Sequence, residues 1–385
     1  MNMVKLGCNN IHYGENATSA LEELPSEKKR AMIVMTGTVM EDLGLLKPVT
    51  DALEKGGFKW EKYTDIEEDA TFASISRGIA AIKAFEPDWI IAFGGGSAID
   101  AAKTLWVMYE NPEVSKLKEI ALPNFFKKIR ERARLCCIPT SAGTGSECTI
   151  AAMVKDTEKL RKVVVVGTKK RLIPDVAILD PLYSASMPKG LTAGSGMDVI
   201  THIVEAYVSV SANPFSDGLA ISAFIQARSA LPIAYENGKD LAAREKMLLA
   251  SCMAGISFAN CGLGINHSIA HSFGAEFGVP HGLANAIILP HTIKFNETDA
   301  KVSARYRELA SFVGENSLLG VIEDLNARLG IPKTMREFIK DDAAFEKKFE
   351  DVSKKSTEDV NNYSSPVKPT PEQMKALVKE VYYGK

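Results

Sequence analysis

The spacing of apolar residues changes part of the way along this chain, and that change constrains the fold more than any other feature. In the first part, short apolar runs typical of buried strands alternate with longer segments of helical spacing. This alternation predicts a mostly parallel sheet covered by helices. The strand-like runs are 30–35, 58–63, 88–93, 135–138, 163–166 and 174–179, and the helix-like segments are 43–55, 71–85 and 97–108.

Beyond the joint PKGLTAGSG, which begins at Pro188, strand-like runs nearly disappear. We therefore expect an α/β domain with a Rossmann-like sheet at 1–187 and an all-α domain at 188–385. The segment 334–364 is rich in Lys, Glu and Asp and is interpreted as solvated surface. The expected helices are 191–210, 215–234, 240–260, 265–277, 300–312, 317–329 and 371–382.

Composition narrows the classes of function. Hydrophobic residues make up 46% of the 385, enough for ordinary cores, and the formal net charge of −2 offers no basic field for nucleic acid or an anionic membrane. The sequence shows neither an apolar run of membrane-spanning length nor the apolar stretch of a secretory signal. The six cysteines form no CxxC pair. We expect a cytoplasmic protein with reduced thiols.

Two polar loops follow strand-like runs in the first domain, GGGSAIDAAK at 94–103 and PTSAGTGSE at 139–147. Glycine lets a backbone approach a ligand closely, and a helix that starts there directs its first N–H groups towards a pyrophosphate. The first loop lacks the GxGxxG spacing, so alone it is equally well an ordinary tight turn. Two such loops at the carboxyl ends of parallel strands favour a dinucleotide site.

Four of the six histidines fall between 202 and 281, in the predicted helical domain. Asp198 and His202 are four residues apart and would share one face of a helix, and His267 and His271 repeat that spacing. His281 follows a proline, where an exposed turn can direct an imidazole inward. A suitable ligand set for divalent iron or zinc, able to act as a Lewis acid on an alcohol or carbonyl oxygen, is Asp198, His202, His267 and His281.

Several buried imidazoles would need many hydrogen-bond partners, and a metal satisfies them together. Lone histidines are more often structural, and His12 and His291 are interpreted so. His271 lies one turn beyond the third ligand, so we expect it beside the same cavity as a proton relay or outer residue, not as a ligand. Glu205 and Glu276 are either acceptors behind the ligands or surface charges.

With these residues in place, the chain resembles the iron-containing (group III) alcohol dehydrogenases from about Gly14 to the last predicted helix. The shared strings are the two loops above, GMDVITHIVEAYVS at 196–209 and NHSIAHSFGAEFGVPHGLANAIILP at 266–290. The resemblance implies a metal- and NAD(P)-dependent dehydrogenase of primary alcohols and their aldehydes, with Fe2+ or alternatively Zn2+. It also implies a dehydroquinate-synthase-like architecture, an active site in the cleft between the two domains, and a homo-oligomer, in this family often a dimer.

Matching positions give the same four metal ligands and place His271 beside the metal and nicotinamide. Members that prefer NAD often carry an aspartate after the first central strand, where this chain has Met35-Thr36-Gly37-Thr38. A 2′-phosphate needs that room, so the stretch favours NADP(H). The cofactor-binding residues implied are Gly37, Gly95, Gly96, Ser97, Asp100, Thr140, Ser141, Thr144, Thr149 and Lys162.

Two other functions stand beside this prediction. A lyase of the dehydroquinate-synthase type would need several Lys and Arg residues near the metal to hold a phosphorylated sugar acid, and 191–290 has few. A nucleotide-binding protein without catalysis would bind the cofactor without a metal, which a complete ligand set argues against. We therefore predict reversible hydride transfer between NAD(P)(H) and a small alcohol or aldehyde.

Overall fold

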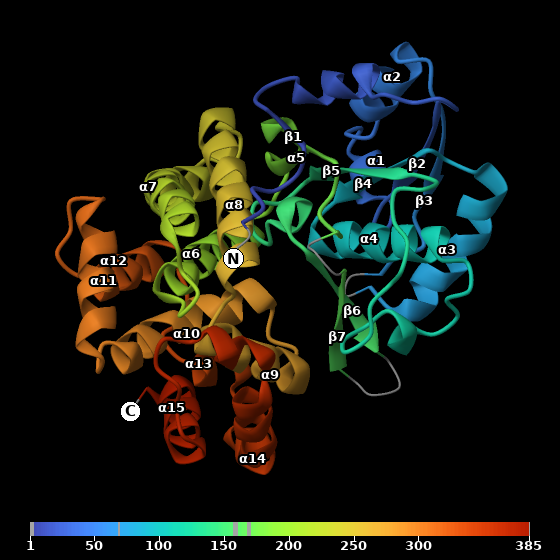
Figure 1. The fold of residues 1–385 in the computed structure, drawn as a ribbon. Helices are drawn as coiled ribbons and strands as arrows, with labels where there is room; N and C mark the ends of the chain where they lie inside the picture. The colour runs from blue at the N-terminus through green and yellow to red at the C-terminus, as the bar shows by residue number, and fades with distance from the viewer. Residues whose placement is uncertain (1–3, 68–69, 157–160, 168–170, 385) are drawn as a thin grey trace. The chain divides into compact units, whose positions relative to one another are not determined.

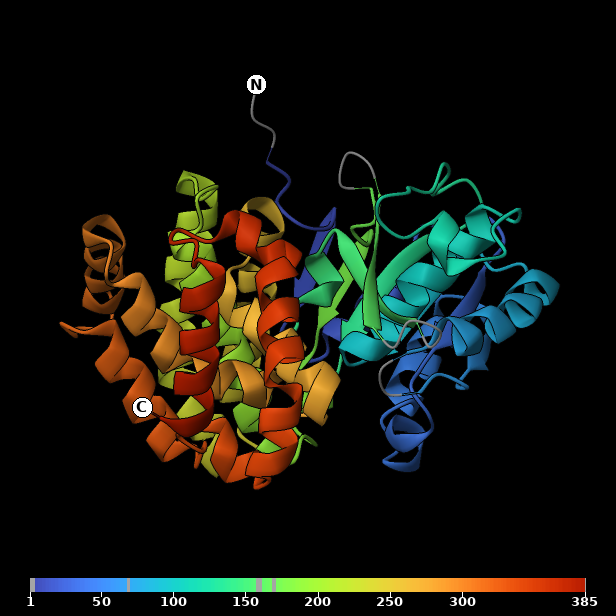
Figure 2. The ribbon, with the colours of Figure 1, turned by 90° about the horizontal axis from the view of Figure 1, so that it is seen from below.

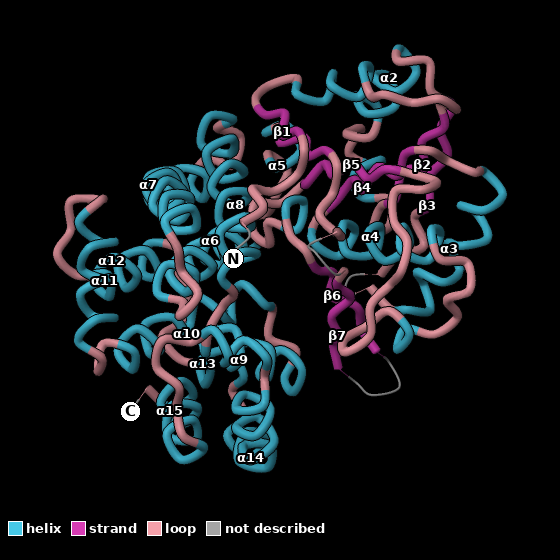
Figure 3. The backbone as a smooth tube through the Cα atoms, viewed as in Figure 1, coloured by secondary structure: helices cyan, strands magenta, loops and turns pink. Residues whose placement is uncertain are grey.

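A computed structural model describes residues 4–67, 70–156, 161–167 and 171–384 (Figure 1). The chain divides into two compact units, Lys5–Ser186 and a second whose main part is Met187–Lys385. Within the described ranges, every strand belongs to the first unit and the second is built of helices (Figure 3). The predicted fold class, an α/β half followed by a helical half, is confirmed.

The first unit contains a six-stranded parallel sheet. Its spatial order is β1 (Asn10–Tyr13), β8 (Val176–Leu179), β5 (Arg134–Pro139), β4 (Trp89–Gly94), β2 (Arg30–Val34) and β3 (Lys59–Tyr63). The chain runs from β2 to one edge of the sheet and from β4 towards the other edge. The strand order therefore reverses between β2 and β4, the point at which open α/β sheets bind ligands at their carboxyl ends.

Alternate side chains of the central strands pack on opposite faces of this sheet. Ile90 and Ala92 of β4 belong to the core under α3 (Phe72–Phe85) and α4 (Gly96–Glu110). Ile91 and Phe93 belong to the core on the other face. Burial on both faces explains why these strands appear in the sequence as unbroken apolar runs. The elements of that second core are η1 (Ala17–Glu23), α2 (Lys47–Lys55) and α5 (Pro181–Ser184).

The strand-like run at 163–166 does not join the parallel sheet, so that part of the prediction was wrong. It lies in β7 (Arg161–Val166), which pairs antiparallel with β6 (Ala151–Asp156) in a separate two-stranded sheet. Four consecutive valines indicate a strand but not its partner. Neither β6 nor the exposed edge strand β1 was predicted, because both are short and only partly apolar.

All of the helices predicted for the second unit form, and α10 (His281–Asn296), α13 (Met335–Ile339) and α14 (Asp342–Glu358) are additions to them. Figures 1 and 2 show α14 and α15 lying side by side. No single described helix is long and apolar enough to cross a membrane, although the pair α8 and α9, bent by 106°, passes that test together. The elements are α6 (Lys189–Val208), α7 (Pro214–Glu236), α8 (Leu241–Cys261), α9 (Ile265–Phe277), α10 (His281–Asn296), α11 (Ala300–Ser311), α12 (Leu318–Arg328), α13 (Met335–Ile339), α14 (Asp342–Glu358), η5 (Val360–Ser364) and α15 (Pro371–Tyr383).

The interpretation of 334–364 as solvated surface holds for most of the segment but not for all of it. This segment contains α14, whose Phe345, Phe349 and Val352 are buried in a core shared with α9 and α15. These residues recur at helical intervals among charged ones, so the high charge content concealed an amphipathic helix.

The sequence predicts six reduced cysteines, several of them in the core. All six are buried, and no disulfide joins them in the described structure.

Candidate metal and dinucleotide sites

Three helices bring the four predicted metal ligands together. Asp198 and His202 lie one turn apart on α6, His267 lies on α9, and His281 is the first residue of α10. From Oδ1 of Asp198, the Nε2 atoms of His202 and His267 are each 3.8 Å away and that of His281 is 3.5 Å away. Donor atoms about 2.1 Å from a tetrahedral cation lie about 3.4 Å apart. The donor atoms of Asp198, His267 and His281 all lie within 4.8 Å of one another and fit a divalent ion. His202 approaches Asp198 but is not part of this group of three, so its place as the fourth ligand stays a prediction.

Glycines allow the helices that carry these ligands to approach closely. A Cβ atom on Gly282 would lie 2.3 Å from the carbonyl oxygen of Gly194. Gly194 is one turn before Asp198, and Gly282 follows His281 directly. The contact between α6 and α10 at these glycines thus brings the carboxylate and the imidazole together. Asp198 is buried, whereas the His281 side chain is 37% exposed and leaves one side of the donor set accessible.

Glu205 lies behind His267 and fixes its ring. Its Oε1 accepts hydrogen bonds from the backbone N–H groups of Asn266, at 2.8 Å, and His267, at 3.3 Å, and its Oε2 contacts Nδ1 of His267. When Glu205 is ionised, this contact makes Nδ1 the protonated nitrogen and leaves the Nε2 lone pair facing Asp198. Burial raises the pKa of Glu205 to about 7 and lowers the pKa of His267 to about 4. His267 is therefore a neutral ligand at neutral pH.

The sequence did not decide whether Glu205 and Glu276 are acceptors behind the ligands or surface charges, and the structure gives the two acids different roles. Glu205 is the acceptor behind a ligand, as described above. Glu276 instead forms ion pairs with Lys348 and Lys355 of α14.

Sequence reasoning missed Asn285. Its Nδ2 donates to Oδ1 of Asp198 at 2.7 Å and lies 3.2 Å from Nε2 of both His267 and His281. Its Oδ1 accepts from Nδ2 of Asn266 at 2.9 Å, which sets the orientation of the carboxamide. Burial alone would raise the pKa of Asp198, but the three imidazoles and this hydrogen bond hold it below its ordinary value. The sequence contained one indication of this role: Asn285 lies four residues, or one helical turn, after His281 and would share its face of a helix.

His271 lies beside the ligands, as predicted. Its ring centroid is 5.5 Å from that of His281 and 6.0 Å from that of His267. Its Nδ1 donates to Oδ2 of Asp359 at 2.9 Å, and Oδ1 of Asp359 accepts from the N–H of Asn361 at 2.9 Å. Asp359 therefore orients the ring and leaves Nε2 as the proton acceptor. Asp359 belongs to the segment interpreted as surface, so its role was missed.

In the other unit, the predicted cofactor loops follow neighbouring strands. The N–H of Thr140, after β5, donates to the carbonyl oxygen of Gly94 at 3.0 Å, which joins the start of the second loop to the end of β4. Gly37 follows β2 and has φ of +60°, a conformation that suits glycine. The three loops therefore lie at one sheet edge, on both sides of the point where the strand order reverses.

Glycine is required where the first two loops touch. A Cβ atom on Gly96 would lie 2.7 Å from Cγ2 of Thr144, and one on Gly95 would lie 3.2 Å from Oγ of Ser141. Gly95 caps α4 without a side-chain hydrogen bond, and Ser97 lies in the first turn. The first N–H groups of a 15-residue helix thus begin between the two loops, where an anion is favoured.

Two other residues predicted to bind the cofactor, Asp100 and Thr149, form hydrogen bonds within the protein. Oδ1 of Asp100 accepts from Oγ of Ser146 at 2.5 Å, and Oδ2 accepts from the N–H of Met153 at 2.9 Å. Oγ1 of Thr149 accepts from Nζ of Lys103 at 3.0 Å. Contact between Asp100 or Thr149 and a cofactor stays a prediction. The side chain of Lys162 lies outside the described residues.

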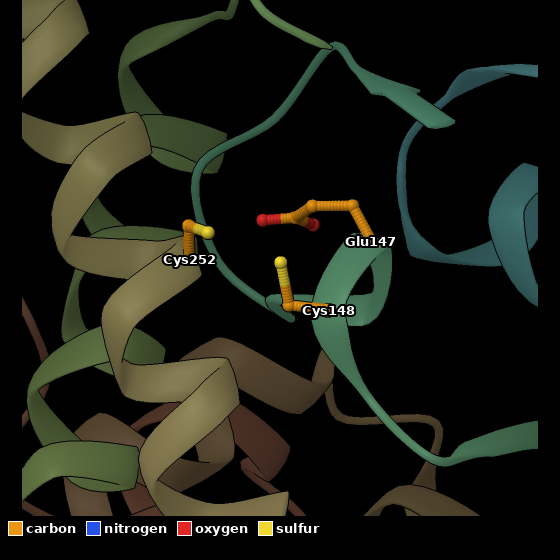
Figure 4. Close-up of side chains that lie close together, drawn as sticks. All are labelled: Glu147, Cys148 and Cys252. Carbon is orange, nitrogen blue, oxygen red and sulfur yellow. The ribbon is translucent and has the colours of Figure 1, made fainter. Parts of the chain in front are cut away.

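The second loop ends in the turn η3 (Ser146–Cys148), from which Glu147 and Cys148 project (Figure 4). Burial raises the pKa of Glu147 to about 7. Sγ of Cys148 lies 3.5 Å from Sγ of Cys8. Sγ of Cys8 also donates to the carbonyl oxygen of Glu147 at 3.3 Å, so Cys8 contacts this turn from within the same unit.

Comparison with known proteins adds independent information. The family model described as iron-containing alcohol dehydrogenase matches residues 8–181, and that of the C-terminal part of the Fe-containing alcohol dehydrogenase family matches 192–382. The NADPH-dependent butanol dehydrogenase of Clostridium saccharobutylicum is 36% identical over 381 residues, covering 97% of this chain and 96% of that protein. The bifunctional aldehyde-alcohol dehydrogenase of Escherichia coli is 35% identical over 399 residues, but the match spans only 44% of its length. The structure of the iron-containing alcohol dehydrogenase of Thermococcus thioreducens superposes with a TM-score of 0.91, at 32% identity and 100% coverage of both chains.

Proposed function

Because this chain belongs to the iron-containing alcohol dehydrogenase family, we propose that it transfers hydride reversibly between NAD(P)(H) and a primary alcohol or its aldehyde. The observation that carries this proposal is the convergence of one carboxylate and three imidazoles from α6, α9 and α10. A protein that only binds nucleotides has no use for such a donor set.

Fe2+ is the proposed ion, with Zn2+ as the alternative, held by Asp198, His202, His267 and His281. When bound, the ion supplies Lewis acidity towards the oxygen of the alcohol or aldehyde. The protein prepares its donors for this role: Asp198 stays charged, and Glu205 keeps His267 in the tautomer with a lone pair on Nε2. The exposed side of His281 gives a substrate its approach.

His271 is the proposed catalytic residue for proton transfer. Its Nδ1 proton is committed to Asp359, so its Nε2 accepts the proton of the alcohol in oxidation and returns it in reduction. Asp359 acts through His271 and is a positioning residue.

The dinucleotide is proposed to bind the glycine loop and the second loop, with its nicotinamide exchanging the hydride. We propose NADP(H) as the preferred form because no acid follows β2 directly. The nearest acids in sequence are already engaged: Glu41 pairs with Lys62 at 2.5 Å, and Asp42 accepts from Thr38 at 3.0 Å. The NADPH dependence in the name of the clostridial relative supports the same preference.

Hydride transfer requires the nicotinamide to meet the substrate held by the helical unit. We therefore propose that the domains, divided at 187/188, form the active site together in a cleft. The proposed homodimer is supported by the family resemblance.

The test is steady-state oxidation of NADPH and of NADH with a panel of short aldehydes. Protein stripped by a chelator is rebuilt anaerobically with Fe(II) or with Zn(II). Turnover that depends on the metal, faster with NADPH, is the expected result. The matched variant is His267→Ala, which should lose both metal content and turnover. Tight cofactor binding without turnover, with either Fe(II) or Zn(II), would refute the proposal that the protein is a dehydrogenase. Retained metal content and activity in His267→Ala would refute the proposed ligand set.

A further inference from the structure

A lysine lies fully buried beneath the proposed dinucleotide loops. Lys103, on α4, has 0% of its surface exposed. Its Nζ, which carries three N–H groups, is shared among four acceptors: the carbonyl oxygen of Ala151 at 2.8 Å, Oγ1 and the carbonyl oxygen of Thr149 at 3.0 and 3.1 Å, and Oγ of Ser146 at 3.2 Å. Lysine is almost never fully buried unless it is paired, because removing its charge from water is costly. The full burial of Lys103 therefore indicates that its ammonium group has a specific structural or functional role.

All of these acceptors lie on one stretch of chain, from η3 to the start of β6. Lys103 itself lies on the helix that begins at the glycine loop. Its ammonium group therefore ties the helix of the first loop to the end of the second. This link between the two loops does not depend on side chains alone, because two of the four acceptors of Lys103 are backbone carbonyl oxygens.

Asp100 reinforces this link from the preceding turn of α4. Its two carboxylate oxygens accept from the Ser146 hydroxyl and from the N–H of Met153. Ser146 thus donates to the carboxylate and accepts from the ammonium group of Lys103. Asp100 also compensates the buried positive charge, so the acid and the lysine act as a pair.

The second loop is consequently held at both ends. At its start, the Thr140 N–H bonds to the carbonyl oxygen of Gly94, and at its end, Lys103 holds Ser146 and Thr149. Between these anchors, Thr144 packs against Gly96 with no space for another carbon atom. A loop fixed at two ends and pressed against a helix start keeps its hydroxyl groups in place before a ligand arrives.

We propose that Lys103 is a positioning residue that sets the affinity for the dinucleotide by fixing 146–151 against α4. This inference rests on the proposed function, because it assumes that these loops bind NAD(P)(H). A purely structural lysine would affect folding but not the affinity of the folded protein for the cofactor.

The experiment measures the Kd for NADPH, by its fluorescence, on the full-length protein rebuilt with Zn(II). Lys103→Met removes the ammonium group and keeps the length of the side chain. Ser146→Ala is the milder variant, because Lys103 retains its other acceptors. The matched control is Glu110→Gln, a buried acid at the far end of α4 whose carboxylate accepts from the N–H groups of Glu131, Arg132 and Ala133. Urea unfolding and metal content are measured for every protein.

We expect Lys103→Met to raise the Kd for NADPH about 10- to 100-fold and Ser146→Ala to raise it by a smaller factor, with metal content unchanged. The KM for NADPH should rise more than kcat falls. Glu110→Gln should lose stability and keep the wild-type Kd. Folded Lys103→Met with a wild-type Kd would overturn the inference, as would an equal rise in Glu110→Gln. If Lys103→Met does not fold, a wild-type Kd in Ser146→Ala overturns it instead. Absence of NADPH and NADH binding by the wild type would refute the proposed function itself.

Discussion

Replacing Glu205 by Gln tests whether the acid behind His267 controls metal binding. Oε1 of residue 205 accepts from two backbone N–H groups, so a glutamine must place its oxygen there and direct its NH2 group towards Nδ1 of His267. Nδ1 can then only accept, and the ring proton moves to Nε2, the atom that faces Asp198. Loss of an outer partner of this kind typically weakens metal affinity 10- to 100-fold, or about 1.4–2.7 kcal/mol.

The assay is a competition titration with a chromophoric chelator, using Zn(II) at neutral pH. Glu276→Gln provides the control, because it removes the same charge from an acid that pairs with Lys348 and Lys355 instead of a ligand. We expect Glu205→Gln to release Zn(II) to weaker competitors while Glu276→Gln behaves as the wild type. Equal affinity in Glu205→Gln and wild type, with both proteins folded, would refute the argument from the tautomer. Equal losses in both variants would show that net charge, not the hydrogen bond, is responsible.

Three further predictions concern other parts of the molecule. Gly96→Ala places a carbon atom 2.7 Å from Thr144 and should raise the Kd for NADPH about tenfold without loss of metal, as a fluorescence titration would show. Asp359→Asn should lower kcat about tenfold at unchanged metal content, since it weakens the hold on His271, and an unchanged kcat would exclude that role. Burial opposes ionisation of Asp88, but its hydrogen bonds hold its pKa below the ordinary value. Its folded pKa is thus lower than its unfolded pKa of about 3.9, so its contribution is present above that pH and lost in acid. Asp88→Asn should therefore cost about 1 kcal/mol at neutral pH, a difference that disappears in urea unfolding as the pH falls below about 4.

Periodicity in the sequence sufficed for helices with clear ends. The prediction for α9 matches the structure to the residue, because Gly264 and Gly278 flank it and Gly278 takes the left-handed conformation common after helices. The start of α10 was predicted as a turn instead. Pro280 caps this helix and Pro290 lies inside it, and both residues ordinarily argue against a helix in a sequence. His281 nevertheless lies beside the other proposed ligands. It is the first residue of α10, so the start of that helix sets the direction of its side chain.

The candidate site shows what a single sequence cannot reveal. Spacing of four residues linked Asp198 with His202, and the same spacing would have linked His281 with Asn285. The partner of His271 is different, because Asp359 lies 88 residues away and within a charged segment. Lys103 was quoted as part of a motif, yet only the packed unit shows its burial. Contacts made over long sequence separations leave no periodic signal, so neither partnership could be predicted.

The proposed ligands of the ion come from α6, α9 and α10, so an ion bound there would act as a cross-link as well as a reagent. It joins segments that are 69 and 83 residues apart along the chain, counted from Asp198 to His267 and to His281. A ligand that binds only the folded chain stabilises it by about 2.7 kcal/mol when its free concentration is 100 times its Kd. On the proposed function, metal supply would govern how long the helical unit stays folded as well as how fast the enzyme reacts. With the proposed metal in short supply, the amount of folded enzyme would fall together with its activity, by the same equilibrium.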